Sequence, residues 1–184
     1  VSKKVLVTWS KARPELAGRE LSDIADELGC DIYEAAERLQ PAGAVYFAMN
    51  EEDVQRILAH PNAMFGSDGL PHDEHPHPRL WGTFPRILGH YCRELKLFSL
   101  EEAVRRMTGY SAETFGLVDR GVIRPDAFAD VTIFDEDKIL DGATFDAPKT
   151  QAAGIDMVLV NGRPVWQAGT ETGARPGRAL RHGG

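Results

Sequence analysis

The sequence has few cysteines, no long apolar run and no excess of basic residues. Its two cysteines, Cys30 and Cys92, form no CxxC pair, which excludes a disulfide-rich scaffold and suits a reducing cytoplasm. No stretch approaches about 18 consecutive apolar residues, so no membrane-spanning helix is predicted. The 21 Lys and Arg against 28 Asp and Glu give a formal charge of −7, whereas nucleic-acid binding needs a basic face. We expect a cytoplasmic protein that binds neither nucleic acid nor membrane.

No signal peptide is predicted from the sequence, which begins at Val1 without Met, and we expect a piece of a longer protein. Its 184 residues suffice for one domain with a small satellite. They are too few for a complete eight-stranded α/β barrel, which takes about 250 residues. With 42% hydrophobic and 27% charged residues, the composition is that of an ordinary globular protein.

Hydrophobic periodicity places alternating strands and helices in the first part of the chain. The expected strands cover residues 4–9, 44–49 and 63–66, and the expected helices cover 21–28, 31–40 and 51–59. The order strand, helix, strand over residues 44–66 is typical of a βαβ unit with parallel strands. Chemistry in such sheets gathers beyond the carboxyl ends of the strands, which is where Ser67 and Asp68 fall.

Helices and then short strands are expected in the second part. A loop rich in Pro and His covers residues 70–81, and helices are predicted over 82–97, 99–109 and 111–117. Strands are predicted over 121–123, 129–134, 157–160 and 164–166. The dipeptide Asn161-Gly162 is a strong signal for a two-residue β-hairpin.

Asp68 is the first candidate for chemistry, because glycines at 66 and 69 leave the backbone free to aim its carboxylate into a cleft. Such a carboxylate can take a proton from a water and return it to a leaving group. The structural alternative is a turn Asp that caps the next segment. Ser67 does not fit the G-x-S-x-G pattern of a nucleophilic serine, so we interpret it as a structural residue or a partner at the site mouth.

Three histidines and an arginine follow in the loop. His72, His75 and His77, with Asp73 and Glu74 between them, offer the imidazole and carboxylate ligands that zinc accepts, but the HExxH spacing is absent, and we favour residues at the mouth of a site. Arg79 has the planar fork that grips a carboxylate with two parallel hydrogen bonds. An ordinary ion pair with Asp73 or Glu74 is the alternative.

Three segments together resemble the N-acyl-D-amino-acid deacylases, or D-aminoacylases, of the amidohydrolase superfamily. They are MFGSDGLPHDEHPHPRLWGTFPR (Met64–Arg86), EEAVRRMTGYSAETFGL (Glu101–Leu117) and RGVIRPDAFADVTIFD (Arg120–Asp135). The first is much the most specific, whereas the third identifies only the superfamily. The resemblance covers nearly the whole chain and matches it to the C-terminal part of the family.

The resemblance implies an α/β fold. The chain would be the C-terminal portion of a (β/α)₈ barrel with a helical insertion, followed by part of a small β-sandwich. Residues 1–43 would be the helical insertion or lid, 44–118 the last barrel strands and helices, 119–170 the small β domain, and 171–184 a flexible basic tail. Residues 44–49 and 63–67 would be the last two barrel strands.

The resemblance also implies amide hydrolysis of N-acyl-D-amino acids. Asp68 matches the family's catalytic aspartate, and Arg79 falls where the family binds the substrate α-carboxylate. A zinc-bound hydroxide would attack the acyl carbonyl while Asp68 accepts the proton and passes it to the departing amine.

Two departures from the family pattern matter. The family's zinc ligands precede the position matched by Val1, so we expect zinc in the full-length parent, no metal in this chain, and a chain that is inactive alone. Asp126 stands where superfamily members often have Gly; Asp tolerates a left-handed turn, so we expect the fold to survive. Barrel strands taken alone leave an unpaired edge, which predicts self-association or pairing with the missing N-terminal part.

Two alternative functions are open at this stage. A cyclic-amide hydrolase, such as a dihydroorotase or hydantoinase, shares the barrel and the terminal aspartate. A non-catalytic assembly module is favoured by the missing zinc ligands. The sequence leaves open the side-chain and acyl preference of the enzyme.

Overall fold

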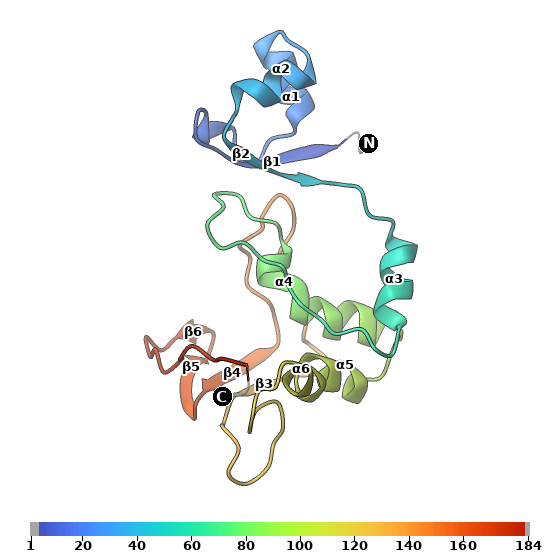
Figure 1. The fold of residues 1–184 in the computed structure, drawn as a ribbon, viewed down its shortest axis with the longest axis vertical. Coiled ribbons are helices and arrows are strands. Elements are labelled where there is room, and N and C mark those ends of the chain that lie inside the picture. Colours follow the sequence, from blue (N-terminus) through green and yellow to red (C-terminus); the bar gives the residue numbers. More distant parts are fainter. Residues whose placement is uncertain (1–3, 183–184) are drawn as a thin grey trace. The chain divides into compact units, whose positions relative to one another are not determined.

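The computed structural model describes residues 4–182 and contains both helices and strands (Figure 1). The described chain divides into two compact units, each built from separate stretches of sequence. The N-terminal unit consists of residues 4–54, 67–81 and 143–150, and the C-terminal unit of residues 55–66, 82–142 and 151–182. The division into segments 1–43, 44–118, 119–170 and 171–184 remains a prediction.

The N-terminal unit is built on two antiparallel strands, β1 (Val5–Ser10) and β2 (Ala42–Tyr46). A 3₁₀ turn, η1 (Pro14–Leu16), and two short helices, α1 (Leu21–Leu28) and α2 (Ile32–Arg38), connect them. Their apolar faces meet in one core, formed by Val7, Leu16, Ile24 and Leu39. The strand predicted over residues 4–9 and both helices are therefore confirmed.

The predicted parallel βαβ unit is wrong within this chain. β2 pairs antiparallel with β1, and residues 63–70 have no regular secondary structure. A parallel strand is stable only with a hydrogen-bonded neighbour, and every strand pair among residues 4–182 is antiparallel. The intervening helix, α3 (Glu51–Ala59), is confirmed.

The helices of the second part begin at α4 (Arg79–Arg86), which continues into the π-helix η2 (Ile87–Glu94). Next come α5 (Leu100–Met107) and α6 (Gly109–Thr114). Ser99 caps α5 as its sequence predicts, because its Oγ accepts the Glu102 N–H at 3.2 Å. No helix within residues 4–182 is long and apolar enough to cross a lipid bilayer.

Four short strands form an antiparallel sheet in the order β3-β4-β5-β6. They are β3 (Val131–Phe134), β4 (Ile155–Val160), β5 (Arg163–Gln167) and β6 (Thr170–Glu171). The hairpin predicted at Asn161-Gly162 joins β4 to β5, and both residues have the positive φ of a type I′ turn, 47° and 75°. Asp126 has φ 68°, as predicted, whereas residues 121–123 are not a strand.

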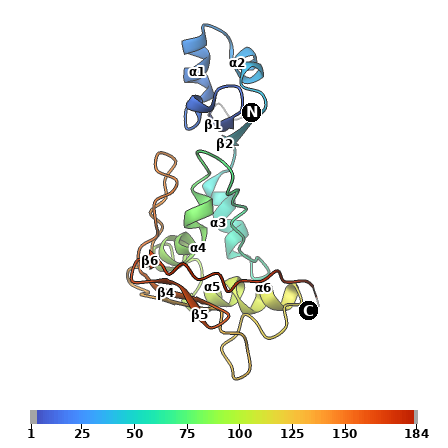
Figure 2. The ribbon, with the colours of Figure 1, turned by 90° about the vertical axis from the view of Figure 1, so that its left-hand side faces the viewer.

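The C-terminal tail runs past α6 (Figure 2). Asn161 Nδ2 donates to Pro176 O at 2.8 Å, the Arg178 guanidinium lies 4.5 Å from the centre of the Phe128 ring, and His182 Nδ1 lies 2.8 Å from Phe115 O. Where we expected a flexible tail, the structure therefore shows contacts with the C-terminal unit at three places.

Candidate functional site

Asp68 lies in the irregular segment that follows α3, with a left-handed backbone at φ 48°. Non-glycine residues adopt this conformation rarely, and Asp is among those that tolerate it. The next turn is tightened by Ser67, whose Oγ accepts the Gly69 N–H at 3.3 Å. The Asp68 side chain is 82% exposed, so its carboxylate is open to solvent and to a ligand.

Gly69 brings this segment against the first turn of α4. A Cβ at position 69 would lie 2.6 Å from Leu80 Cδ1 and 2.8 Å from Leu80 Cα, distances that no side chain could occupy without displacing its neighbours. The close approach places Arg79 Nη2 2.7 Å from Asp68 Oδ2. The two candidates singled out in the sequence are thus brought together.

Arg79 forms an ion pair with Asp68, and Asp73 is buried beside His72. Whether Arg79 binds substrate or makes an ordinary ion pair remains a prediction. The Arg79 side chain is 38% exposed, and exposed ion pairs contribute little to stability. The guanidinium is therefore partly open to solvent.

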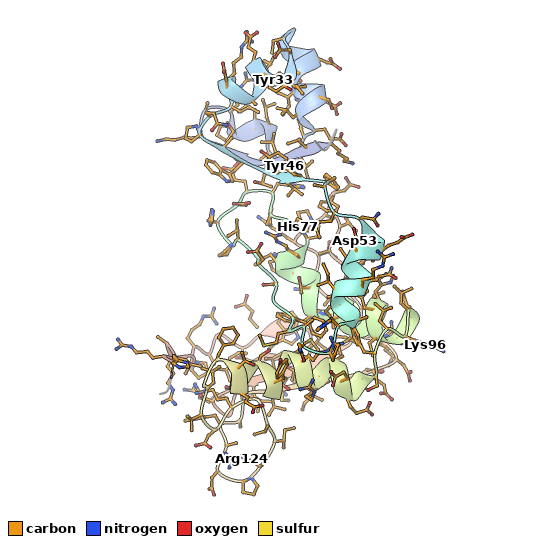
Figure 3. All side chains as sticks on the ribbon, turned by 45° about the vertical axis from the view of Figure 1, so that its right-hand side comes forward. Tyr33, Tyr46, Asp53, His77, Lys96 and Arg124 are labelled. Atoms are coloured by element: carbon orange, nitrogen blue, oxygen red, sulfur yellow. The ribbon has the colours of Figure 1, made fainter. Side chains whose placement is uncertain are left out.

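His77 supports the pair from the residues just before α4, where Figure 3 shows it. Its Nδ1 accepts the backbone N–H of Arg79 at 3.0 Å, so this nitrogen carries no proton. Burial lowers the pKa of His77, the Arg79 charge lowers this pKa further, and Asp68 opposes both effects. The lowered pKa favours the neutral imidazole, which is the form that can accept a hydrogen bond at Nδ1.

The other two loop histidines make different contacts. His75 Nε2 donates to Phe145 O at 2.6 Å, and its backbone N–H donates to Thr8 O at 3.0 Å. His75 thus fastens the loop to β1 and to residues 143–150. His72 is exposed, and its Nε2 lies 3.3 Å from Asp73 Oδ1. Placement of Ser67, His72 and His75 at a site mouth remains a prediction.

Sequence reasoning missed two aromatic residues that adjoin the site. Phe145 lies with its ring centre 5.0 Å from that of His77, edge to face, and 4.6 Å from that of Phe47. Phe145 is 68 positions from His77 in the chain, and its surroundings contain no periodic apolar pattern. Only tertiary packing could identify it.

Within residues 4–182, no three His, Cys, Asp or Glu side chains gather closely enough to hold a metal ion. Residues from elsewhere would have to complete any metal site next to Asp68.

The chain is similar to proteins of one family. The sequence profile of the Amidohydrolase family matches residues 24–166, more than half of the chain. A D-aminoacylase from Alcaligenes xylosoxydans xylosoxydans is 56% identical over 96% of this chain. An N-acyl-D-aspartate deacylase from the same organism is 50% identical over the whole chain.

A solved structure is also similar. It is the N-acyl-D-glutamate deacylase from Bordetella bronchiseptica, complexed with zinc and a phosphonate that mimics the reaction's tetrahedral intermediate. It is 52% identical, with a TM-score of 0.92 over 96% of this chain and 37% of that one. The chain likewise spans 37% of the length of the two curated relatives.

Proposed function

The chain belongs to the amidohydrolase family, and from that premise we propose that it is part of an enzyme that deacylates N-acyl-D-amino acids. The products would be a D-amino acid and a carboxylate. The observation that carries this proposal is the contact between Asp68 and Arg79, two groups with complementary tasks in such a reaction, 2.7 Å apart. Similarity to three deacylases of acylated D-amino acids supports the substrate class.

Asp68 would handle the proton. Amide hydrolysis requires a base that takes a proton from the attacking water and an acid that delivers a proton to the leaving nitrogen. An exposed carboxylate on a short, glycine-flanked turn can do both in sequence.

Arg79 would hold the substrate. Its guanidinium can form two parallel hydrogen bonds with the α-carboxylate of an acyl amino acid. Because Asp68 lies within contact of the same group, the susceptible amide, a few bonds from the carboxylate, would be held near the proton acceptor. Position, more than binding strength, is what such an arrangement supplies.

Zinc is part of the proposal for the full-length parent only. A related deacylase was crystallised with zinc, but the described residues offer no group of three ligands. The roles proposed for Asp68 and Arg79 use only residues of this chain, and we propose that the chain alone does not hydrolyse substrate. An amidase assay on N-acetyl-D-amino acids, run on the chain and on the full-length protein, tests this. Activity of the short chain would overturn it.

We also propose how the chain fits into its parent. Residues 1–43 would form a helical insertion, 44–118 the end of a (β/α)₈ barrel, and 119–170 a share of a small β-sandwich. The exposure of apolar residues in the N-terminal unit supports a missing neighbour, namely Tyr33 at 77%, Tyr46 at 66% and Met49 at 73%. The N-terminal part of the protein, or a second copy, would cover them.

Replacing Arg79 by Lys should raise the KM of the full-length protein for N-acetyl-D-amino acids about tenfold or more, because the ammonium cannot form the two parallel hydrogen bonds. Steady-state kinetics measures this. Arg86→Lys is the matched control, since Arg86 pairs with Asp141 instead, and its KM should not change. Equal KM values for both variants would contradict the role of Arg79.

Replacing Gly69 by Ala should lower kcat/KM about 10- to 100-fold, because the new methyl collides with Leu80 and parts Asp68 from Arg79. Gly66→Ala is the control, since a Cβ at position 66 meets nothing within 4 Å. Full activity of the Gly69 variant would mean that the contact between segment and helix is not needed.

A further inference from the structure

A chain of contacts leads from Phe145 to the candidate site. The Phe145 ring meets the edge of His77, with ring centres 5.0 Å apart and planes at 73°. His77 Nδ1 accepts the Arg79 N–H, and Arg79 contacts Asp68. Phe145 belongs to a segment, residues 143–150, that packs into the N-terminal unit from far along the chain.

The contact between His77 and Arg79 exists only while Nδ1 has a free lone pair. A protonated imidazole has a hydrogen on both nitrogens. Nδ1–H would then face the Arg79 N–H, and the hydrogen bond would be lost. The orientation of the first residue of α4 therefore depends on the protonation state of His77.

Several groups act on this protonation state. Burial opposes the charged imidazolium, and Arg79 adds like-charge repulsion, whereas Asp68 favours the charge. His75 binds Phe145 O. The ammonium of Lys4 lies 4.9 Å from the centre of the Phe47 ring, which itself packs against Phe145. The Phe145 ring is the apolar body against which the imidazole packs.

We propose that Phe145 is a positioning residue for the Asp68–Arg79 pair, acting through His77. It covers the imidazole and keeps Nδ1 free to accept the Arg79 N–H, and the Arg79 guanidinium is thereby held at Asp68. The inference rests on the proposed function only in giving the pair its chemical task. The contacts themselves and their test do not depend on turnover.

Phe145 makes one contact through its side chain and another through its backbone. Its ring covers His77, and its carbonyl holds His75 Nε2 at 2.6 Å. A side-chain substitution removes the ring and leaves the carbonyl in place. The role of the ring can therefore be separated from the fastening of the loop.

The experiment is an NMR titration of the imidazole of His77 in the 184-residue chain. In the unsubstituted 184-residue chain the titration midpoint of His77 should lie below the ordinary value of about 6.5. Phe145→Ala should raise this midpoint toward about 6.5, because water then reaches the imidazole ring. The Arg79 amide proton should lose its downfield shift in the same variant.

Phe128→Ala is the matched control, since Phe128 also packs against charged side chains, Arg120 at 4.1 Å and Arg178 at 4.5 Å, but in the C-terminal unit. It should leave the His77 midpoint unchanged. An unchanged midpoint in Phe145→Ala, or equal shifts in both variants, would overturn the proposal. If Phe145→Ala does not fold, Phe145→Leu replaces it in the titration. A His77 midpoint above that of the unsubstituted chain then supports the proposal, and an unchanged midpoint overturns it.

His77→Asn supplies a rescue, because Asn Oδ1 can accept a hydrogen bond at the place of Nδ1 and does not titrate. In His77→Asn the Arg79 amide proton should stay downfield between pH 5 and 8, whereas in His77→Ala it should move upfield. Identical Arg79 signals in the two variants would overturn the link. Absence of amidase activity in the full-length protein would instead refute the proposed function. It would not affect the test of Phe145, because the Arg79 and His77 NMR signals do not depend on turnover.

Discussion

Asp68→Asn should lower the kcat of the full-length protein by about 10² to 10⁴-fold, the usual contribution of a general acid-base group. The amide has nearly the shape of the carboxylate, so the turn at φ 48° and the contact with Arg79 can persist. The Asn side-chain amide cannot take up a proton near neutral pH. The loss should therefore appear in kcat, and KM for the acylated amino acid should change little.

The matched control is Asp126→Asn. Asp126 is also an exposed aspartate with a positive φ, 68°, so the two variants impose the same demand on the backbone. Steady-state kinetics on N-acetyl-D-amino acids should give normal kcat for Asp126→Asn. A kcat within a few-fold of normal for Asp68→Asn would remove Asp68 from the proposed mechanism, since proton transfer contributes about 10²-fold or more.

Arg106→Ala should destabilise the C-terminal unit by about 3–5 kcal/mol, the range for losing one partner of a buried charged network. The Arg106 side chain is 1% exposed, and its Nη1 donates to Leu58 O at 2.7 Å and His60 O at 3.0 Å. The guanidinium also lies 4.8 Å from the centre of the Phe65 ring and 4.4 Å from that of Phe98. Its removal leaves two carbonyls without this donor and a gap between two rings.

Arg105→Ala should lower the free energy of unfolding by only about 0–1 kcal/mol, because exposed ion pairs contribute no more than that to stability. Glu102 Oε1 lies 3.3 Å from Arg106 Nε and also pairs with Arg105, which precedes Arg106 on α5 but has a side chain that is 48% exposed. Because the chain has two units, hydrogen exchange of the α5 amides is the appropriate measurement. Equal protection in both variants would show that the buried contacts of Arg106 do not stabilise the unit.

Sequence reasoning succeeded where short-range rules decide the outcome. The helices α1, α2 and α3 follow from apolar residues at helical spacing. Gly29 stops α1 and a turn follows Ala59 as expected, whereas α2 ends at Arg38, before the predicted end at residue 40. The cap at Ser99 and the hairpin at Asn161-Gly162 depend on residues within a few positions. Such features need no knowledge of distant parts of the chain.

It failed where the partner is distant. An apolar run at residues 63–66 resembles a strand, but a strand forms only if another offers its backbone hydrogen bonds, and here none does. The antiparallel choice of β2 was equally hidden, because β1 is more than 30 residues upstream. Local pattern gives the tendency to extend and leaves the pairing undetermined.

For the candidate site, the sequence by itself determined which residue types are available: a carboxylate between glycines at Asp68 and a guanidinium at Arg79, the first residue of α4. Tertiary structure decided that these two groups meet, because the backbone at Gly69 lies against Leu80. It also decided that His77 accepts the Arg79 N–H and that Phe145 covers His77. The sequence lists the reactive residue types. The distances between their side chains, and the exclusion of water from them, arise only when segments that are remote in the chain pack together.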